Sequence, residues 1–511
     1  MSDRAKCMLA VGIAGVAGIV AVVCYDQGYL SYGHLAVAAV VIAAGIAVYV
    51  FRHSRASYRR WVIPSLLESH FAPLPLADLL ISQRRFPLHI RVDVQRALER
   101  VFQDLEVIRL TGIRKETAFF GVDFSDLTTL DSSPAVATAP QYEDVDVGEE
   151  RPVRCLQNGL WLLKRGKLPC VLLMSQVGNP CDPGSLRLEF ATKDDADGAA
   201  ATEAIFGRLE QAVADASCYR GKILSFEVRA SYRGESSGVT VHRLRTVERE
   251  QVILPQRTLE LLERNVLQFV RQRPGLRKFR QATKKGLLFY GPPGNGKTHT
   301  IHYLAKALPE HTTFLISAEQ VQYLSHYMTL ARLLQPALVV VEDVDLIARD
   351  REDMRHPVEE TLLNKLLNEI DGLREDADIL FILTTNRPES LETALTARPG
   401  RIDQAIEFPL PDDAGRQKLV ALYSHGATLS EELARTIAAR TDGVSAAFIR
   451  ELMRRSLQFH LEDGGTGALA LRDVESALDE MLFAGGSLNV KLLGGLVRLG
   501  ADSPAATTET S

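Results

Sequence analysis

The longest apolar stretches of the chain lie near its N-terminus. Residues 7–25 and 35–51 contain no charged side chain, and each has about the length, roughly 17 to 25 residues, that crosses a bilayer core as a helix. Basic residues precede the first stretch and follow the second, whereas the loop between them, "DQGYLSYGH", has no Lys or Arg. Because basic side chains favour the cytoplasmic side of a membrane, the pattern predicts a two-pass transmembrane hairpin over 1–60, in a cell or inner membrane, with both termini in the cytoplasm.

The next part of the chain divides into three regions by its periodicity. Apolar residues recur at helical spacing around "VDVQRALERVFQDL", so 61–126 is predicted to be a helical segment. Residues 127–150 are rich in Thr, Ser, Pro and acidic side chains without helical or strand period, which predicts a flexible linker. Four strand-like stretches and the amphipathic "ATEAIFGRLEQAVADAS" predict an α+β domain over 151–245. Its one histidine, His242, and its dispersed carboxylates form no catalytic pattern, so recruitment of substrate is the expected role.

Composition and charge narrow the possible functions. With 511 residues the chain is long enough for several domains, and its net charge of −5 gives no overall attraction to nucleic acid. The six cysteines show no CxxC pair and no metal-ligand spacing, which favours isolated reduced thiols over disulfides or a metal centre. We therefore expect most of the chain to lie in a reducing compartment.

A glycine-rich motif follows the apolar run "GLLFY" and precedes the expected helix "THTIHYLAKAL". Its glycines allow successive backbone N–H groups to turn inward and form an anion-binding nest at the start of the helix. We expect Lys297 to reach the β- and γ-phosphates of a nucleotide and the Thr298 hydroxyl to hold Mg²⁺. The residues predicted to bind the nucleotide are Gly291, Pro292, Pro293, Gly294, Asn295, Gly296, Lys297, Thr298 and His299.

Two further apolar runs end in polar residues that suit the same site. "PALVVVEDVDLIA" presents Glu342 and Asp343 after a buried run, and "DILFILTTN" ends at Asn386. Ligands bind outside the carboxyl ends of the strands in open α/β sheets, so we expect these side chains beside the γ-phosphate. We assign Glu342 to the metal shell, through water, and Asp343 to polarising the attacking water. An exchange of these two roles is the alternative.

These motifs, the "LLNEIDGL" helix and the "ARPGRID" segment occur in an order and spacing that resemble an AAA ATPase of the AAA+ superfamily, over residues 252–485. The resemblance implies an α/β fold in which a P-loop core over 246–412, with a parallel sheet, flanking helices and an N-terminal linker, is followed by a small helical lid over 413–485. A C-terminal tail over 486–511 remains after the lid.

The resemblance also implies roles for residues and partners. Asn386 matches the first sensor, and Arg398 and Arg401 match the arginine fingers that act on the neighbouring subunit's site. ATP and Mg²⁺ are the implied cofactors. The implied assembly is a homo-oligomeric ring, most often a hexamer, that acts on a protein client.

Three features depart from the usual pattern of this family. The segment after Ser317 is short and lacks an aromatic-apolar-Gly pore loop, which leaves Tyr323 and Tyr327 as the nearest pore candidates, with helix packing as the alternative. "GVSAAFIREL" differs from the customary lid sequence, so no second sensor is assigned. The acidic pair reads Glu342 then Asp343, the reverse of the usual order of aspartate then glutamate. This reversed acidic pair, the short segment and the expected anchor are similar to a mitochondrial inner-membrane branch that translocates a folded Rieske subunit.

The leading hypothesis is a membrane-anchored AAA ATPase that remodels, extracts or translocates proteins. A membrane protease in one chain is disfavoured, because no HExxH motif follows the lid. A nucleic-acid motor is suggested by "RQRPGLRKFRQATKK", where seven of fifteen residues are basic, but no base-stacking aromatic pattern accompanies that run. A nucleotide-gated scaffold with little hydrolysis is the remaining alternative. A cleaved signal peptide in place of the hairpin is disfavoured, because "AVVCYD" is a poor cleavage site.

Overall fold

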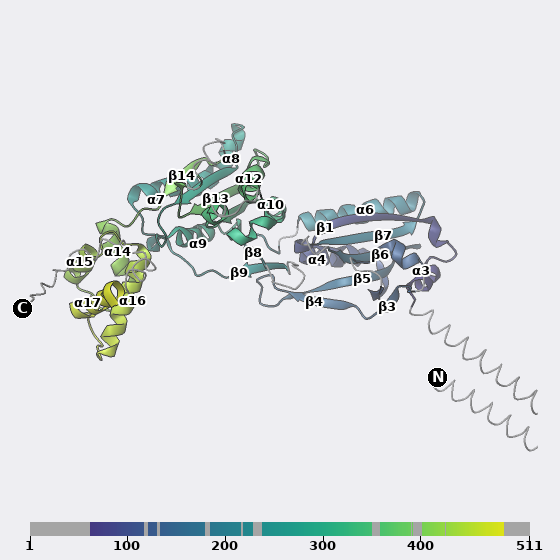
Figure 1. The fold of residues 1–511 in the computed structure, drawn as a ribbon. Coiled ribbons are helices and arrows are strands. Elements are labelled where there is room, and N and C mark those ends of the chain that lie inside the picture. The colour runs from purple at the N-terminus through teal and green to yellow at the C-terminus, as the bar shows by residue number, and fades with distance from the viewer. Residues whose placement is uncertain are drawn as a thin grey trace, which may run out of the picture. The chain divides into compact units, whose positions relative to one another are not determined.

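The computed structural model describes residues 62–484, apart from 117–120, 130–132, 179–183, 216–217, 228–237, 350–357, 390, 392–400 and 425. The predicted hairpin and the C-terminal tail lie outside the described residues. Of the helices that are described, none is both long and apolar enough to span a bilayer. The chain divides into two compact units, the first ending at 216 and the second beginning at 217, except that 146–152 belong to the second. Each unit has its own sheet (Figure 1).

The sheet of the first unit has the strand order β1-β7-β6-β5-β2-β3, with β4 paired to β5, and every pair is antiparallel. Its strands are β1 (Leu79–Pro87), β2 (Glu106–Arg114), β3 (Val136–Thr138), β4 (Gln141–Val145), β5 (Val153–Arg165), β6 (Leu168–Val177) and β7 (Ser185–Lys193). Its helices are α3 (Ile63–Phe71), α4 (Arg91–Val101), α5 (Phe124–Thr128) and α6 (Ala196–Ala214).

Helices cover both faces of this first sheet. Successive side chains of a strand point to opposite faces, so two neighbouring residues of β7 show both helical layers. On β7, the Phe190 ring packs against Phe206 of α6 with centroids 6.3 Å apart. The next residue, Ala191, belongs to the cluster that includes Ile63 and Leu67 of α3. The central strands are therefore buried on both sides, and the described part of this unit is a sheet between two helical layers.

The sheet of the second unit has the order β14-β10-β13-β12-β11-β8-β9, parallel from β14 to β8 and antiparallel between β8 and β9. Its strands are β8 (Ile223–Glu227), β9 (Gly238–His242), β10 (Lys285–Tyr290), β11 (Thr312–Ile316), β12 (Ala337–Val341), β13 (Ile379–Thr385) and β14 (Gln404–Glu407). Every residue of β12 and β13 is buried, as expected where helices cover both faces of a parallel sheet.

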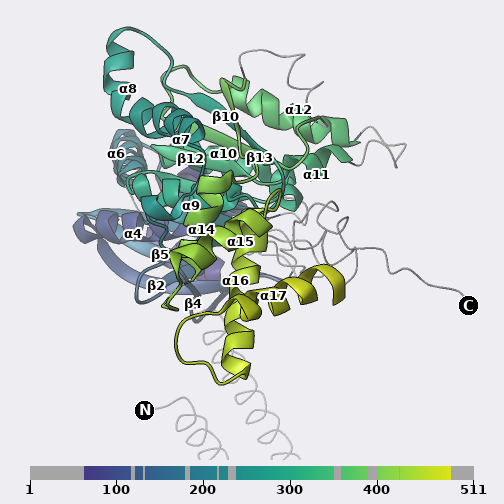
Figure 2. The same ribbon diagram turned by 90° about the vertical axis from the view of Figure 1, so that its left-hand side faces the viewer.

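The helices of this second core lie before, between and after the strands. They are α7 (Gln256–Leu262), which continues through the π-helix Glu263–Gln268 into α8 (Phe269–Lys278), then α9 (Lys297–Ala307), α10 (Leu324–Leu333), α11 (Val344–Arg349) and α12 (Val358–Asp371). A further group, α14 (Asp413–Tyr423), α15 (Glu431–Arg440), α16 (Ala446–Glu462) and α17 (Leu471–Asp479), packs around its own apolar core (Figure 2). The predicted parallel sheet is confirmed, and the segment predicted to form the lid is helical.

The structure differs from the sequence prediction in the region before this core. The segment 61–126 is not purely helical, because it contains β1 and β2, and 127–150 is not a linker throughout, because β3 and β4 pair with β2 and β5. β4 is largely exposed and polar, β3 is only three residues long, and the apolar start of β1 is followed by the polar run Ser82–Arg85, so these strands lack a sustained apolar alternation. The predicted domain over 151–245 also loses β8 and β9, because β8 pairs with the distant β11 of the second unit.

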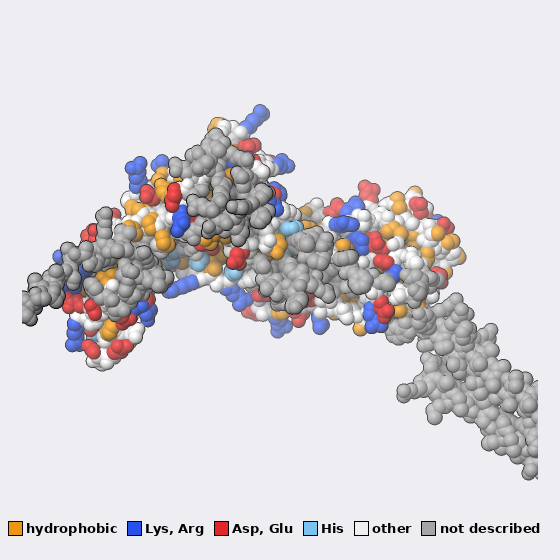
Figure 3. Space-filling model, in the orientation of Figure 1, with side chains coloured by type: hydrophobic (Ala, Val, Ile, Leu, Met, Phe, Trp, Pro, Cys, Tyr) orange, Lys and Arg blue, Asp and Glu red, His pale blue; other side chains and the backbone are white. Residues whose placement is uncertain are grey.

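The basic run 271–285 is largely occupied by contacts within the second unit. Arg273 is 4% exposed and donates to the carbonyl oxygen of Thr283 at 3.0 Å, and Arg277 pairs with Asp378 at 2.5 Å. On the face drawn in Figure 3, Lys and Arg side chains are interspersed with Asp and Glu. These contacts favour a structural role for the run over a phosphate-binding surface for nucleic acid.

Candidate nucleotide-binding site

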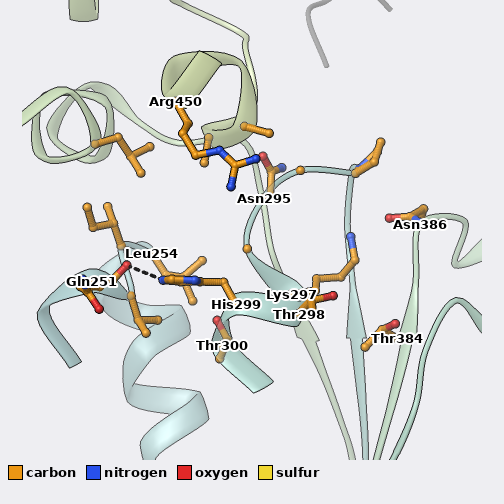
Figure 4. A pocket seen from close by; sticks show the side chains of 18 of the residues that line it. Gln251, Leu254, Asn295, Lys297, Thr298, His299, Thr300, Thr384, Asn386 and Arg450 are labelled. Atoms are coloured by element: carbon orange, nitrogen blue, oxygen red, sulfur yellow. Dashed lines mark hydrogen bonds between the residues drawn. The ribbon is translucent and has the colours of Figure 1, made fainter. Parts of the chain in front are cut away.

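A cavity of about 390 Å³ lies where β10, β12 and β13 end, between the sheet and the lid (Figure 4). The predicted site residues that line it are Pro293, Gly294, Asn295, Gly296, Lys297, Thr298, His299, Asp343 and Asn386. Gly291 and Pro292 touch the cavity's lysine, and Glu342 contacts Thr298. The fold thus brings together motifs that are separated by nearly a hundred residues in the sequence.

The glycine-rich loop has the backbone geometry that an anion nest requires. Gly291, Gly294 and Gly296 have φ values of 140°, 80° and 89°. Residues that carry a Cβ rarely adopt such positive φ values. A Cβ at Gly291 would lie 2.3 Å from the carbonyl oxygen of Phe408, whereas one at Gly296 would meet nothing within 4 Å. Open space therefore lies directly at the start of α9, where free backbone N–H groups attract anions.

Lys297 begins α9 and is only 7% exposed. Its Nζ donates to the carbonyl oxygens of Gly291 at 2.6 Å and Pro292 at 3.0 Å. An ammonium has three donors, so one N–H remains for a phosphate oxygen. Burial lowers the pKa of Lys297 from 10.5 to about 8, although Asp343 and Asp345 oppose the shift.

The acidic pair is split between two neighbours. The Thr298 hydroxyl donates to Glu342 Oε1 at 2.8 Å, and Asn386 Nδ2 donates to Asp343 Oδ1 at 3.0 Å. The Asp343 backbone has a left-handed φ of 49°, and its N–H donates to the hydroxyl of Thr384 at 3.0 Å. Glu342 therefore lies beside the hydroxyl that is predicted to hold Mg²⁺, while Asp343 lies beside Asn386, the predicted sensor.

Asp345 supports this arrangement and was missed by the sequence analysis. It is 2% exposed, and its Oδ1 accepts from the Thr385 hydroxyl at 3.0 Å and from the Asn386 backbone N–H at 3.1 Å. These bonds fix the end of β13, which holds the amide that contacts Asp343. The signal in the sequence was the third acid of "EDVD", which directly follows the predicted strand.

The lid supplies one wall of the cavity. Ala447 N–H donates to the carbonyl oxygen of Gly294 at 3.0 Å, and Ser445 caps α16 by accepting from Phe448 N–H at 3.2 Å. Figure 4 shows Arg450 extending from α16 toward Asn295. The sequence analysis assigned no second sensor, but a cation one turn into a predicted lid helix could have indicated Arg450.

Of the two predicted arginine fingers, the structure describes only Arg401. Arg398 lies outside the described residues. Arg401 does not line the cavity; it pairs with Asp371 and donates to Asn368 Oδ1 at 3.3 Å.

The two pore candidates differ in burial. Tyr327 is fully buried, its ring stacks on Phe226 at 3.9 Å, and its hydroxyl accepts from Phe226 N–H at 2.7 Å. Tyr323 is only partly buried. For Tyr327 the alternative of internal packing is therefore correct.

ATP and Mg²⁺ fit the donors that surround the cavity. The start of α9 and Lys297 supply positive charge and N–H donors for phosphate, and the Thr298 and Glu342 oxygens supply the hard ligands that Mg²⁺ prefers. The apolar end, formed by Val252, Leu254 and lid residues, suits a flat base.

Comparisons with known proteins agree with this site. Residues 287–410 match the model of the family described as "ATPase family associated with various cellular activities (AAA)". The chain is 33% identical over 215 residues to a proteasome-activating nucleotidase of Methanothermobacter thermautotrophicus. This alignment covers 39% of this chain and 51% of the relative. It is 31% identical over 272 residues to the ATP-dependent zinc metalloprotease FtsH 3 of Sphaerobacter thermophilus, and the alignment covers 50% of this chain and 54% of the relative.

A proteasome-activating nucleotidase of Methanocaldococcus jannaschii is 31% identical to this chain over 251 residues, and the alignment covers 46% of this chain and 54% of the relative. The chain spans about half the length of these relatives. The matched segment is an AAA ATPase domain, a class that hydrolyses ATP with Mg²⁺. The predictions of an ATPase domain and of its two cofactors are confirmed at this level.

Proposed function

We propose that the protein is a membrane-anchored AAA ATPase that assembles into a homo-oligomeric, hexameric ring and uses ATP hydrolysis to remodel, extract or translocate proteins. The main support is the division of the acidic pair, in which Glu342 contacts Thr298 and Asp343 contacts Asn386. A site that only bound nucleotide would not need a carboxylate held by an amide beside the phosphate nest.

In this proposal the chain's own groups divide the work of binding and hydrolysis. Lys297 and the N–H groups at the start of α9 bind the phosphates, and Thr298 and Glu342 hold the metal side. Mg²⁺, when bound with ATP, would offset negative charge on the phosphate oxygens. Asp343, oriented by Asn386, accepts a proton from the attacking water. Arg450 contributes a cation from the lid.

The ring is proposed because, among the described residues, Lys297 and Arg450 are the only lysine or arginine side chains that line the cavity. Arg398 and Arg401 are assigned to the neighbouring subunit's site, where an arginine finger is worth about 10³ to 10⁵ in rate. Arg401 lies outside its own chain's cavity, which agrees with action on another chain. The ring would hold one shared site at each subunit interface.

The membrane anchor and the client are proposed on narrower grounds. The uncharged stretches 7–25 and 35–51, with their basic flanks, support a two-pass hairpin in a cell or inner membrane and a cytoplasmic ATPase domain. Burial of Tyr327 removes one pore candidate. Together with the reversed acidic pair, it favours a mechanism similar to that of the Rieske translocase branch over threading of an unfolded chain.

Steady-state ATP turnover and equilibrium ATP binding of the full chain test the catalytic assignment. Lys297→Ala is expected to lose both ATP binding and ATP turnover. Asp343→Asn is expected to bind ATP but to hydrolyse it about 10²- to 10⁴-fold more slowly, which is the usual contribution of a general base. Lys278→Ala, an exposed lysine outside the cavity, is the matched control. Wild-type turnover in both site variants would reject the proposed function, and binding without turnover by the wild type would favour the scaffold.

A further inference from the structure

His299 lies at the end of the cavity away from the sensor residues. Figure 4 shows Thr384 and Asn386 on one side of Lys297, and Gln251 and Leu254 on the other, with His299 next to Gln251. This second end is formed by the segment from Gln251 to Leu254, and the lid residues Leu419 and Tyr423 also line the cavity. Since the phosphates belong at Lys297, the base of a nucleotide belongs at this end.

A single hydrogen bond fixes the position and the tautomer of the His299 ring. Its Nε2 lies 3.2 Å from the carbonyl oxygen of Gln251, and a carbonyl oxygen only accepts, so Nε2 carries the hydrogen. In a neutral imidazole that carries its hydrogen on Nε2, Nδ1 presents a lone pair.

The acceptor on Gln251 is itself held in place. The 3₁₀ turn Arg249–Gln251 is closed by reciprocal bonds with Glu248, in which Gln251 Oε1 accepts from the Glu248 N–H at 2.9 Å. Arg249 ties the turn to Glu263 of the following helix at 2.9 Å. Within the part of the chain that the structure describes, His299 Nδ1 has no hydrogen-bond partner. A fixed ring with a spare acceptor thus borders the base end of the cavity.

We propose that His299 determines base specificity by offering this Nδ1 acceptor to the exocyclic amino group of adenine. Guanine has a carbonyl oxygen at the same ring position, whose lone pairs would face the lone pair of Nδ1. A buried polar group discriminates strongly between a ligand that satisfies its hydrogen bond and one that leaves it unpaired. The inference rests on the proposed function, because it requires a nucleotide whose phosphates lie at Lys297.

Binding and turnover of ATP and GTP by the full chain test this inference. His299→Ala removes the acceptor, and His299→Phe removes it while keeping a ring of similar size in the cavity. Both variants are expected to weaken ATP binding about tenfold, the worth of one hydrogen bond to a buried group, and to reduce the preference for ATP over GTP by a similar factor. We expect KM to change more than kcat, because His299 lies on the other side of Lys297 from Asn386, the residue that contacts Asp343 (Figure 4). His302→Ala, on the same helix but outside the cavity, is the control and is expected to keep the wild-type preference.

Two outcomes separate this inference from the proposed function. An unchanged ATP preference in both His299 variants, measured by equilibrium binding, would overturn the role of His299 while the ATPase assignment stands. A wild-type protein that binds ATP in preference to GTP but does not hydrolyse it would contradict the proposed function alone. A wild-type protein that binds neither nucleotide would overturn both.

Discussion

Lys297 shows how burial and function are coupled at a single residue. Its pKa falls from 10.5 to about 8 in the folded protein without nucleotide. Between these two pH values the folded state binds fewer protons than the unfolded state, so this residue makes folding stability rise with pH across that window. Phosphate next to the ammonium favours the charged form and raises the pKa again. Nucleotide binding above pH 8 must therefore take up a proton.

The consequence is a pH-dependent affinity for Mg²⁺-ATP. We expect the dissociation constant to be constant near pH 7 and to increase by up to about tenfold for each pH unit above pH 8, as Lys297 loses its proton in the empty site. Isothermal titration calorimetry across pH 7 to 9.5 measures both the affinity and the proton uptake. Lys297→Arg, which stays charged, should show neither effect. An affinity independent of pH in the wild type would contradict the buried, charged lysine.

The sequence predicted the residues of the phosphate nest but not those that act from a distance. Lys297 and Thr298 could be assigned because a short motif contains all the geometry that phosphate binding needs. For Asp345 and Arg450 the sequence shows only an acid after a strand and a cation in a lid helix, because their roles depend on where β13 and α16 lie in space. The contacts of Arg401 with Asp371 and Asn368 likewise follow from the packing of α12, which no local pattern encodes.

At the scale of elements, the hairpin of β8 and β9 is the main departure from what the sequence indicated. It extends the ATPase sheet beyond β11. Two hydrogen bonds attach its strand β8 to the segment that follows β11. Phe226 donates its N–H to the Tyr327 hydroxyl at 2.7 Å and accepts from Gln320 Nε2 at 2.8 Å. Local patterns identified the two strands correctly, but the partner strand is chosen by non-local packing and could not be predicted.

Removal of one hydroxyl tests the strength of this attachment. Tyr327→Phe keeps the ring that stacks on Phe226 but takes away the acceptor of a buried N–H. We expect the free energy of unfolding to fall by about 1 to 3 kcal/mol, measured by chemical denaturation. Tyr323→Phe, in the partly buried position one turn earlier, is the matched control and should change stability by less than about 0.5 kcal/mol. Equal stability of the two variants would show that the Tyr327 bond does not anchor the hairpin.

At the scale of the whole molecule, each chain carries the predicted phosphate nest, metal ligands and catalytic base, while Arg401, the predicted finger that the structure describes, does not line its own chain's cavity. The proposed ring resolves this by sharing each site between two chains. In the proposed ring, contact with the adjacent subunit would decide whether Arg401 keeps or breaks its ion pair with Asp371. The account therefore predicts that catalytic activity belongs to a pair of adjacent chains and cannot be completed within one.

Turnover in a mixture of two inactive variants tests this central claim most directly. Lys297→Ala has no functional nest but an intact Arg401, and Arg401→Ala has an intact nest but no finger. Each alone is expected to hydrolyse ATP at least about 10²-fold more slowly than the wild type, in keeping with the worth of a finger. Co-assembled in equal amounts, they should regain a substantial fraction of wild-type turnover at interfaces that combine both intact halves. A mixture no more active than the sum of its parts, although mixed rings form, would contradict the account.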